Sequence, residues 1–119
     1  MFEELKWFKL YEMACPCCGQ RHMDMRFLKK LDQARDVAGI PFVINSGYRC
    51  LDHNDMIGGL PDSSHLFGLA ADIATEDSPT RYKTLEALLY VGFNRIGVGK
   101  NFIHVDLDPR KQKNLIWVY

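Results

Sequence analysis

The chain has 119 residues, 47% of them hydrophobic, which suffices for one compact domain with its own core. Fifteen basic residues balance fifteen acidic ones, so no net charge draws the protein to nucleic acid or to an anionic membrane surface, and nucleic-acid binding is disfavoured. The N-terminal segment lacks a basic region followed by a long apolar run, and no stretch is long enough to span a bilayer, so we expect cytoplasmic synthesis without a signal peptide and no membrane insertion.

The spacing of apolar residues predicts two helices. Between residues 24 and 38 they recur every three or four positions, with Asp24 as the N-cap and Gly39 as the stop. A second helix should begin with Ser78 as its cap, followed by a proline, and end at Gly92.

Short apolar and β-branched runs predict strands, whereas the Gly- and Pro-containing stretch 52–64 is expected to be irregular. A helix followed by several short strands favours an α+β fold with a small, mostly antiparallel sheet. The predicted strands are residues 42–45, 69–74, 94–98, 102–107 and 116–119.

Three potential metal ligands, His65, Asp72 and His104, stand in apolar sequence. Taken singly they could be a loop histidine, a strand-end cap and a hydrogen-bonded strand histidine. A carboxylate in an apolar strand needs a partner, however, and a metal ion would supply it. Because alternate strand residues share a face, His104 lies on the same side as Phe102 and Asp106. Three ligands of these types leave a fourth position for water, which is typical of a catalytic zinc.

Four cysteines allow several interpretations. Cys15, Cys17 and Cys18 crowd one turn-like segment, and Cys50 stands alone. A disulfide between Cys50 and the cluster, or a second, structural zinc at Cys15 and Cys18, is one interpretation. Because no second pair completes four ligands and no signal peptide is seen, we favour reduced cysteines that pack as small apolar groups.

Three segments resemble the zinc D-alanyl-D-alanine carboxypeptidase family of peptidoglycan peptidases, in its short, single-domain branch found in phages and prophages. They are VINSGYRC at 43–50, SSHLFGLAADI at 63–73 and GFNRIGVGKNFIHVDLD at 92–108, and the resemblance covers residues 24–108. It implies the hedgehog/DD-peptidase fold, in which a small antiparallel sheet flanked by helices holds one zinc. Residues 1–119 would then form a single zinc peptidase domain, with the cysteine-containing extension 1–23 packed on it.

The resemblance also implies roles for individual residues. His65, Asp72 and His104 would ligate one catalytic Zn²⁺, which lowers the pKa of bound water toward about 7 and polarises the scissile carbonyl. The substrate would be the stem peptide of peptidoglycan, cut by a D-Ala-D-Ala carboxypeptidase or by a murein endopeptidase of the endolysin type. Arg49 matches the family arginine that holds a substrate carboxylate or the developing oxyanion, although a structural ion pair is the alternative.

The general base is less clearly marked. Some relatives carry a histidine two positions before the last ligand and others an acid three before, and here those positions hold Phe102 and Asn101. Asp106 is therefore the candidate base, or else it orients a ligand histidine by accepting its distal N–H. Ser64 and Tyr48 could contact the substrate, or could be turn and packing residues.

Two rival functions follow from the same residues. The missing base positions fit a non-catalytic zinc module, since one fold can serve both catalysis and binding. A phage structural or tail-associated protein is the other rival. We expect a monomer that reaches the cell wall after release during phage lysis or as part of a virion.

Overall fold

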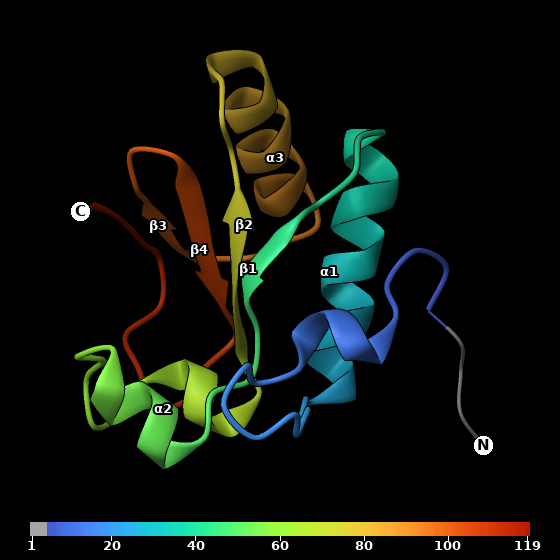
Figure 1. The fold of residues 1–119 in the computed structure, drawn as a ribbon. Coiled ribbons are helices and arrows are strands. Elements are labelled where there is room, and N and C mark those ends of the chain that lie inside the picture. Colours follow the sequence, from blue (N-terminus) through green and yellow to red (C-terminus); the bar gives the residue numbers. More distant parts are fainter. Residues whose placement is uncertain (1–4) are drawn as a thin grey trace.

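The computed structural model describes residues 5–119, so residues 1–4 of the predicted N-terminal extension lie outside the described part. It contains α-helices, 3-10 helices (η) and strands, most of which are labelled in Figure 1. In chain order the elements are η1 (Leu10–Met13), α1 (Met25–Ala38), β1 (Ile44–Ser46), α2 (Leu51–Met56), η2 (Ser64–Phe67), β2 (Ala70–Ala74), α3 (Ser78–Tyr90), β3 (Arg95–Val98), β4 (Phe102–Asp106) and β5 (Leu115–Val118).

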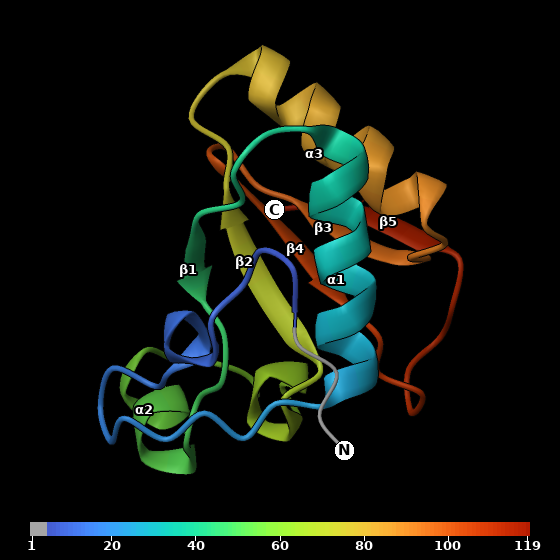
Figure 2. The same ribbon diagram turned by 90° about the vertical axis from the view of Figure 1, so that its right-hand side faces the viewer.

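The strands form one sheet in the order β1-β2-β4-β3-β5. Every neighbouring pair is antiparallel except β3 and β5, which run parallel. The predicted α+β fold with a mostly antiparallel sheet is therefore confirmed. Seen from the side, α1 and α3 lie against one face of this sheet (Figure 2).

Alternation along the strands separates a core face from a polar face. Ile73 on β2, Ile96 on β3, and Ile103 and Val105 on β4 are fully buried in the hydrophobic cluster that also contains residues of α1 and α3. Because successive strand residues point to opposite faces, the residues between them project away from the helices. The polar face of the sheet is thus left open for a functional site.

The ends of the two long helices follow from their caps. Asp24 accepts hydrogen bonds from the backbone N–H groups of Arg26 and Phe27, and Gly39 ends α1 in the left-handed conformation with φ of 68°, so both predicted ends are confirmed. For α3 the predicted cap was wrong by one residue. Asp77 is the cap, because its Oδ1 accepts the N–H of Thr80 at 2.7 Å.

The stretch 52–64 was expected to be irregular, but it contains part of the short helix α2 and ends at the start of η2. Six residues are too few for a helical periodicity to be visible in the sequence. The helix is instead held at its start by Cys50, whose sulfur accepts the N–H of His53, and through Asn54, which is fully buried.

The backbone of the segment before α1 is tied to that helix by the carboxylate of Asp32. Asp32 accepts backbone N–H groups from Lys6, Trp7 and Phe8 at 2.8, 2.9 and 3.2 Å. Phe8 and Met13 are buried in the main core. Along residues 5–119, no helix combines the length and apolarity required to cross a membrane.

Candidate metal centre

One row of residues crosses the polar face of the sheet and assembles the site. In register, Ser46 pairs with Asp72, Asp72 with His104, His104 with Gly97, and Gly97 with Trp117. Directly opposed residues on neighbouring strands have side chains within contact distance. The antiparallel register of β2 and β4 therefore brings the Asp72 carboxylate to the His104 imidazole, although 31 residues separate them along the chain.

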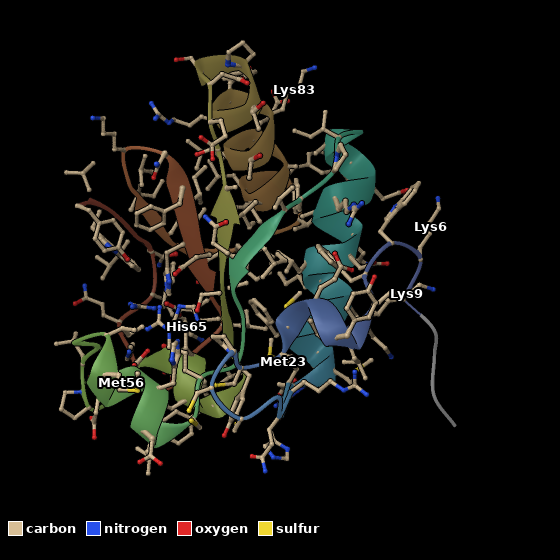
Figure 3. All side chains as sticks on the ribbon, in the orientation of Figure 1. Lys6, Lys9, Met23, Met56, His65 and Lys83 are labelled. Atoms are coloured by element: carbon tan, nitrogen blue, oxygen red, sulfur yellow. The ribbon has the colours of Figure 1, made fainter. Side chains whose placement is uncertain are left out.

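His65 joins these two side chains from η2. One ligand atom of each of the three residues lies within 4.8 Å of the others. Asp72 Oδ1 is 2.9 Å from His104 Nδ1 and 3.4 Å from His65 Nε2. Ligands at about 2.0–2.1 Å from one tetrahedral ion are about 3.3 Å apart, so these three atoms can share a single zinc with small adjustments. Figure 3 shows His65 beside the sheet on the side away from α1.

Each histidine has its second ring nitrogen occupied by a protein acceptor. His65 Nδ1 lies 2.8 Å from the carbonyl oxygen of Gly47, and His104 Nε2 lies 2.8 Å from Asp106 Oδ2. These acceptors fix the tautomers, because the nitrogen that donates to the protein cannot also bind a metal. Nε2 of His65 and Nδ1 of His104 remain as ligand atoms, which is the arrangement that metal-binding histidines commonly show.

Asp106 is surrounded on all sides. Its Oδ1 accepts from Arg95 Nε at 2.7 Å and from the N–H of Asp108 at 3.2 Å, while Oδ2 faces His104. Only 1% of its surface is exposed. Burial acts to raise the pKa of Asp106, but hydrogen bonds from His104 and Arg95 outweigh it and hold that pKa below its ordinary value. Asp106 is therefore ionised and held in place.

Arg49 places a guanidinium next to the three ligands. It donates through Nε to Ser46 Oγ at 3.0 Å, through Nη1 to Asn54 Oδ1 at 3.4 Å and through Nη2 to Asp72 Oδ2 at 3.4 Å. Asn54 in turn donates to the carbonyl of Leu60 at 2.8 Å. Three contacts of this kind fix the plane of the guanidinium, which suits the binding of a carboxylate or an oxyanion.

The Asp72 carboxylate is ionised and attracts positively charged groups. Burial acts to raise the pKa of Asp72, but hydrogen bonds from His104 and His65 outweigh it and keep the pKa well below the ordinary value. The same carboxylate, together with Asp106, raises the pKa of His104 although burial opposes this. Two ionised carboxylates around two imidazoles therefore favour a bound cation.

The three ligand residues and Arg49 line a cavity of about 730 Å³. One wall is aromatic and comes from Phe102, Trp117 and Tyr119; the Phe102 and Tyr119 ring centroids are 5.0 Å apart. Trp117 can reach this wall because its neighbour in register is Gly97, where an added Cβ would lie 2.5 Å from Trp117 Nε1. A cavity of this size accommodates a short peptide segment.

The other two predicted substrate contacts are in different places. Ser64 lines the cavity, and its Oγ donates to Asp108 Oδ2 at 2.8 Å and accepts from Lys111 Nζ at 3.1 Å. Tyr48 is not among the cavity-lining residues, and its ring packs edge-on against His22 at a centroid distance of 5.2 Å. The structure thus brings Ser64 to the site and leaves Tyr48 outside it.

Several cavity residues were not identified from the sequence. Arg95 was missed because its partner Asp106 lies on the neighbouring strand of the β3–β4 hairpin. Alternation along the two strands places both residues on one face of the sheet, and this is the signal that could have identified Arg95. Trp117 and Tyr119 were assigned to an edge strand, but no sequence signal showed that this strand runs parallel to β3.

The sheet and its polar face define an α+β protein with a candidate metal site, in which two histidines and one aspartate line a cavity. The model for the family Peptidase M15 matches residues 6–106. The chain therefore belongs to the Peptidase M15 family, whose members are zinc-dependent, and this membership supports a peptidase. No curated protein matches the chain significantly.

Proposed function

We propose that the protein is a zinc-dependent peptidase that hydrolyses peptide bonds of peptidoglycan stem peptides. The observation that carries the proposal is the convergence of His65, Asp72 and His104 at the floor of the cavity, with an orienting acceptor behind each histidine. Family membership supports the same reaction class. Access to the wall would come from release during lysis or from assembly into a virion.

In this proposal each residue of the site has a separate role. When bound, zinc would supply a Lewis acid that activates water and polarises a carbonyl. Asp106 acts as a positioning residue, because both of its oxygens are already engaged by His104 and Arg95. Arg49 holds a carboxylate or an oxyanion of the substrate at the cavity wall. Ser64 contributes a hydroxyl to the same wall.

Three carboxylates line the cavity and could accept the proton of the attacking water, namely those of Asp62, Asp72 and Asp106. Asp72 is assigned to the metal and Asp106 to His104. Asp62 is exposed, so its carboxylate is open to solvent and to substrate. Replacing Asp62 by asparagine removes its basicity with little change in shape, and a loss of turnover at unchanged zinc content would assign the proton transfer to it.

A second candidate function is a non-catalytic zinc module that binds cell-wall peptides. It is favoured by one observation: Asp106, the predicted base, is 1% exposed and paired on both oxygens. Such a module would bind stem peptides in the same cavity without releasing fragments.

The test combines metal analysis with mass spectrometry of fragments released from purified peptidoglycan. We expect about one zinc at the histidine site, digestion that a chelator stops and zinc restores, and loss of both in His104→Ala. His22→Ala, which changes an exposed histidine, is the matched control and should digest normally. Released terminal D-alanine would indicate a carboxypeptidase, and internal cleavage an endopeptidase. Zinc binding with no fragment from any wall type would favour the module.

A further inference from the structure

A second group of metal-ligand side chains lies apart from the histidine site. Cys15, Cys18 and Cys50 each offer a sulfur that lies within 4.8 Å of the other two. All three are free thiols, as is the neighbouring Cys17. The expectation that the cysteines pack as small apolar groups holds for Cys15, which is buried, but Cys17 and Cys18 are exposed.

The spacing of the sulfurs matches a metal better than a disulfide. Cys15 Sγ and Cys50 Sγ are 3.7 Å apart. Two thiolates bound to one tetrahedral zinc at about 2.3 Å lie about 3.8 Å from each other, whereas a disulfide requires about 2.05 Å. A disulfide between these two residues would also leave Cys18 beside it without a role.

The loop that carries Cys15 and Cys18 is folded as a tight turn around the sulfurs. Pro16 follows Cys15, the N–H of Gly19 donates to the carbonyl of Cys15 at 2.8 Å, and the N–H of Cys15 donates to the carbonyl of Gln20 at 2.7 Å. Gly19 has φ of 75°, a conformation that favours glycine. The turn therefore reverses the direction of the chain and brings Cys18 back toward Cys15.

A backbone N–H group already contacts one of the three sulfurs as it would contact a thiolate. The N–H of His53 donates to Cys50 Sγ at 3.4 Å. Charged sulfur is the form that binds metals, so this donor favours the metal-binding form of Cys50.

We propose that Cys15, Cys18 and Cys50 bind a second zinc ion, which is structural and separate from the histidine site. Each neutral thiol that binds the ion releases its proton to solvent, and no oxidant or reductant is needed. Cys17 is not a ligand, because its sulfur falls outside the group that shares a common centre. Three thiolates leave the fourth position of a tetrahedral zinc to a further ligand.

The proposed ion would link the N-terminal segment, through Cys15 and Cys18, to the loop that carries Arg49 and Cys50. Cys50 directly follows Arg49 and caps α2, the helix whose Asn54 accepts from the Arg49 guanidinium. The same two segments are also joined by a backbone hydrogen bond, in which the N–H of Tyr48 donates to the carbonyl of Met13 at 2.9 Å. The second zinc would therefore fix the position of a cavity residue without touching the cavity.

The experiment uses the full chain with the histidine site disabled by His104→Ala, so that metal at the cysteines is measured alone. Prepared under reducing conditions and loaded with cobalt(II), this variant should bind about one ion and show the near-ultraviolet absorption of cobalt bound to thiolate. Adding Cys18→Ser should abolish the absorption, whereas Cys17→Ser should leave it unchanged. No thiolate absorption, or loss of it in Cys17→Ser, would overturn the assignment.

A second measurement needs no substitution. Wild-type protein with and without zinc is treated with an alkylating reagent, and each cysteine is followed by peptide mass spectrometry. We expect zinc to slow modification of Cys15, Cys18 and Cys50 at least tenfold and to leave exposed Cys17 unprotected. Equal rates with and without zinc, or a Cys15–Cys50 disulfide in the zinc-treated protein, would contradict the proposal. Because peptidase activity is not measured, this outcome is independent of the proposed function.

Discussion

Nε2 of His104 lies 2.8 Å from Oδ2 of Asp106, on the side of the ring away from Asp72. The imidazole is thus held between two carboxylates, with Nδ1 turned toward Asp72 at the candidate metal site and Nε2 toward a buried acceptor. Alternate residues of one strand rarely bond each other directly, since both side chains normally stand perpendicular to the sheet. Here the Arg95 guanidinium holds Asp106 in the orientation that permits it.

This relationship predicts the effect of Asp106→Asn. The amide keeps the shape but lowers the negative charge behind His104, so we expect zinc affinity to fall by about 10- to 100-fold. Turnover should recover when zinc is added in excess, because a positioning residue is needed only to hold the ligand. Competition with a chromogenic chelator gives the affinity, and fragment release at saturating zinc gives turnover. Full zinc occupancy with no turnover would instead identify Asp106 as the base.

Arg49→Lys tests the guanidinium at the cavity wall. Lysine keeps the charge but cannot donate to Ser46, Asn54 and Asp72 at once. If Arg49 holds the oxyanion or a substrate carboxylate, kcat/KM should fall by about 10²- to 10³-fold while zinc content stays unchanged.

Arg26→Lys is the control for this substitution, because the Arg26 side chain is 86% exposed and bonds Asp24 at the start of α1. It should retain wild-type kcat/KM. Loss of zinc in Arg49→Lys would show that the arginine acts by fixing Asp72, which is the structural ion pair considered from the sequence.

The sequence predicted the local part of the site well. Strand alternation placed His104 and Asp106 on one face, and both lie on the polar side of β4. The apolar surroundings of Asp72 indicated that it needs a partner, for which we expected a metal ion, and the structure places His104 opposite to it in register. Both inferences depend on residues close in sequence or on the fixed period of a strand.

Contacts between segments that are far apart in the chain could not be predicted from the sequence. Placing Trp117 over Gly97 requires that β5 return beside β3 in parallel, and no local pattern encodes that choice. The sequence left the contact between Cys50 and the N-terminal cysteines as one interpretation among several, because Cys50 meets Cys15 only after 34 intervening residues have folded. Short elements such as α2 were missed since six residues show too little periodicity.

Gly97→Ala should disturb the aromatic wall. An added Cβ would lie 2.5 Å from Trp117 Nε1 and 2.8 Å from Tyr119 Cε2, so the indole must move. We expect a loss of about 1–3 kcal/mol in the free energy of unfolding, measured by urea denaturation. The loss should shrink when Trp117 is first replaced by alanine. An equal loss in both backgrounds would mean that the strand backbone, and not the indole, is disturbed.

The cap of α1 predicts a dependence on pH. A side-chain hydrogen bond from Arg26 and backbone donors lower the pKa of Asp24 on folding, although burial opposes this. Because the folded pKa is the lower one, the stabilisation by the charge is present above the unfolded pKa of about 3.9 and is lost as pH falls through the folded pKa. Asp24→Ala should cost about 1 kcal/mol at pH 7, and urea denaturation should show the difference shrinking below about pH 4. A difference that is constant with pH would assign the effect to the hydrogen bonds alone.

Asp32 and Asp36 form a matched pair one helical turn apart on α1. Asp32 accepts three backbone N–H groups from residues 6–8 and is 9% exposed, whereas Asp36 bonds the exposed side chains of Lys6 and Trp7. Removing a buried acceptor leaves its donors without partners at a cost of about 1–3 kcal/mol each, while an exposed ion pair contributes about 0–1 kcal/mol. Asp32→Ala should therefore lower the free energy of unfolding by about 2–4 kcal/mol, allowing for partial access of water, and Asp36→Ala by less than about 1 kcal/mol.

Urea denaturation with hydrogen exchange of the amides of residues 6–8 provides the measurement for this pair. In Asp32→Ala those amides should exchange faster than in Asp36→Ala, because only the former loses their acceptor. Equal stability of the two variants would mean that burial of Phe8 and Met13 holds the segment without the carboxylate. Protected amides in Asp32→Ala would lead to the same conclusion, and the attachment of the N-terminal segment would then be apolar.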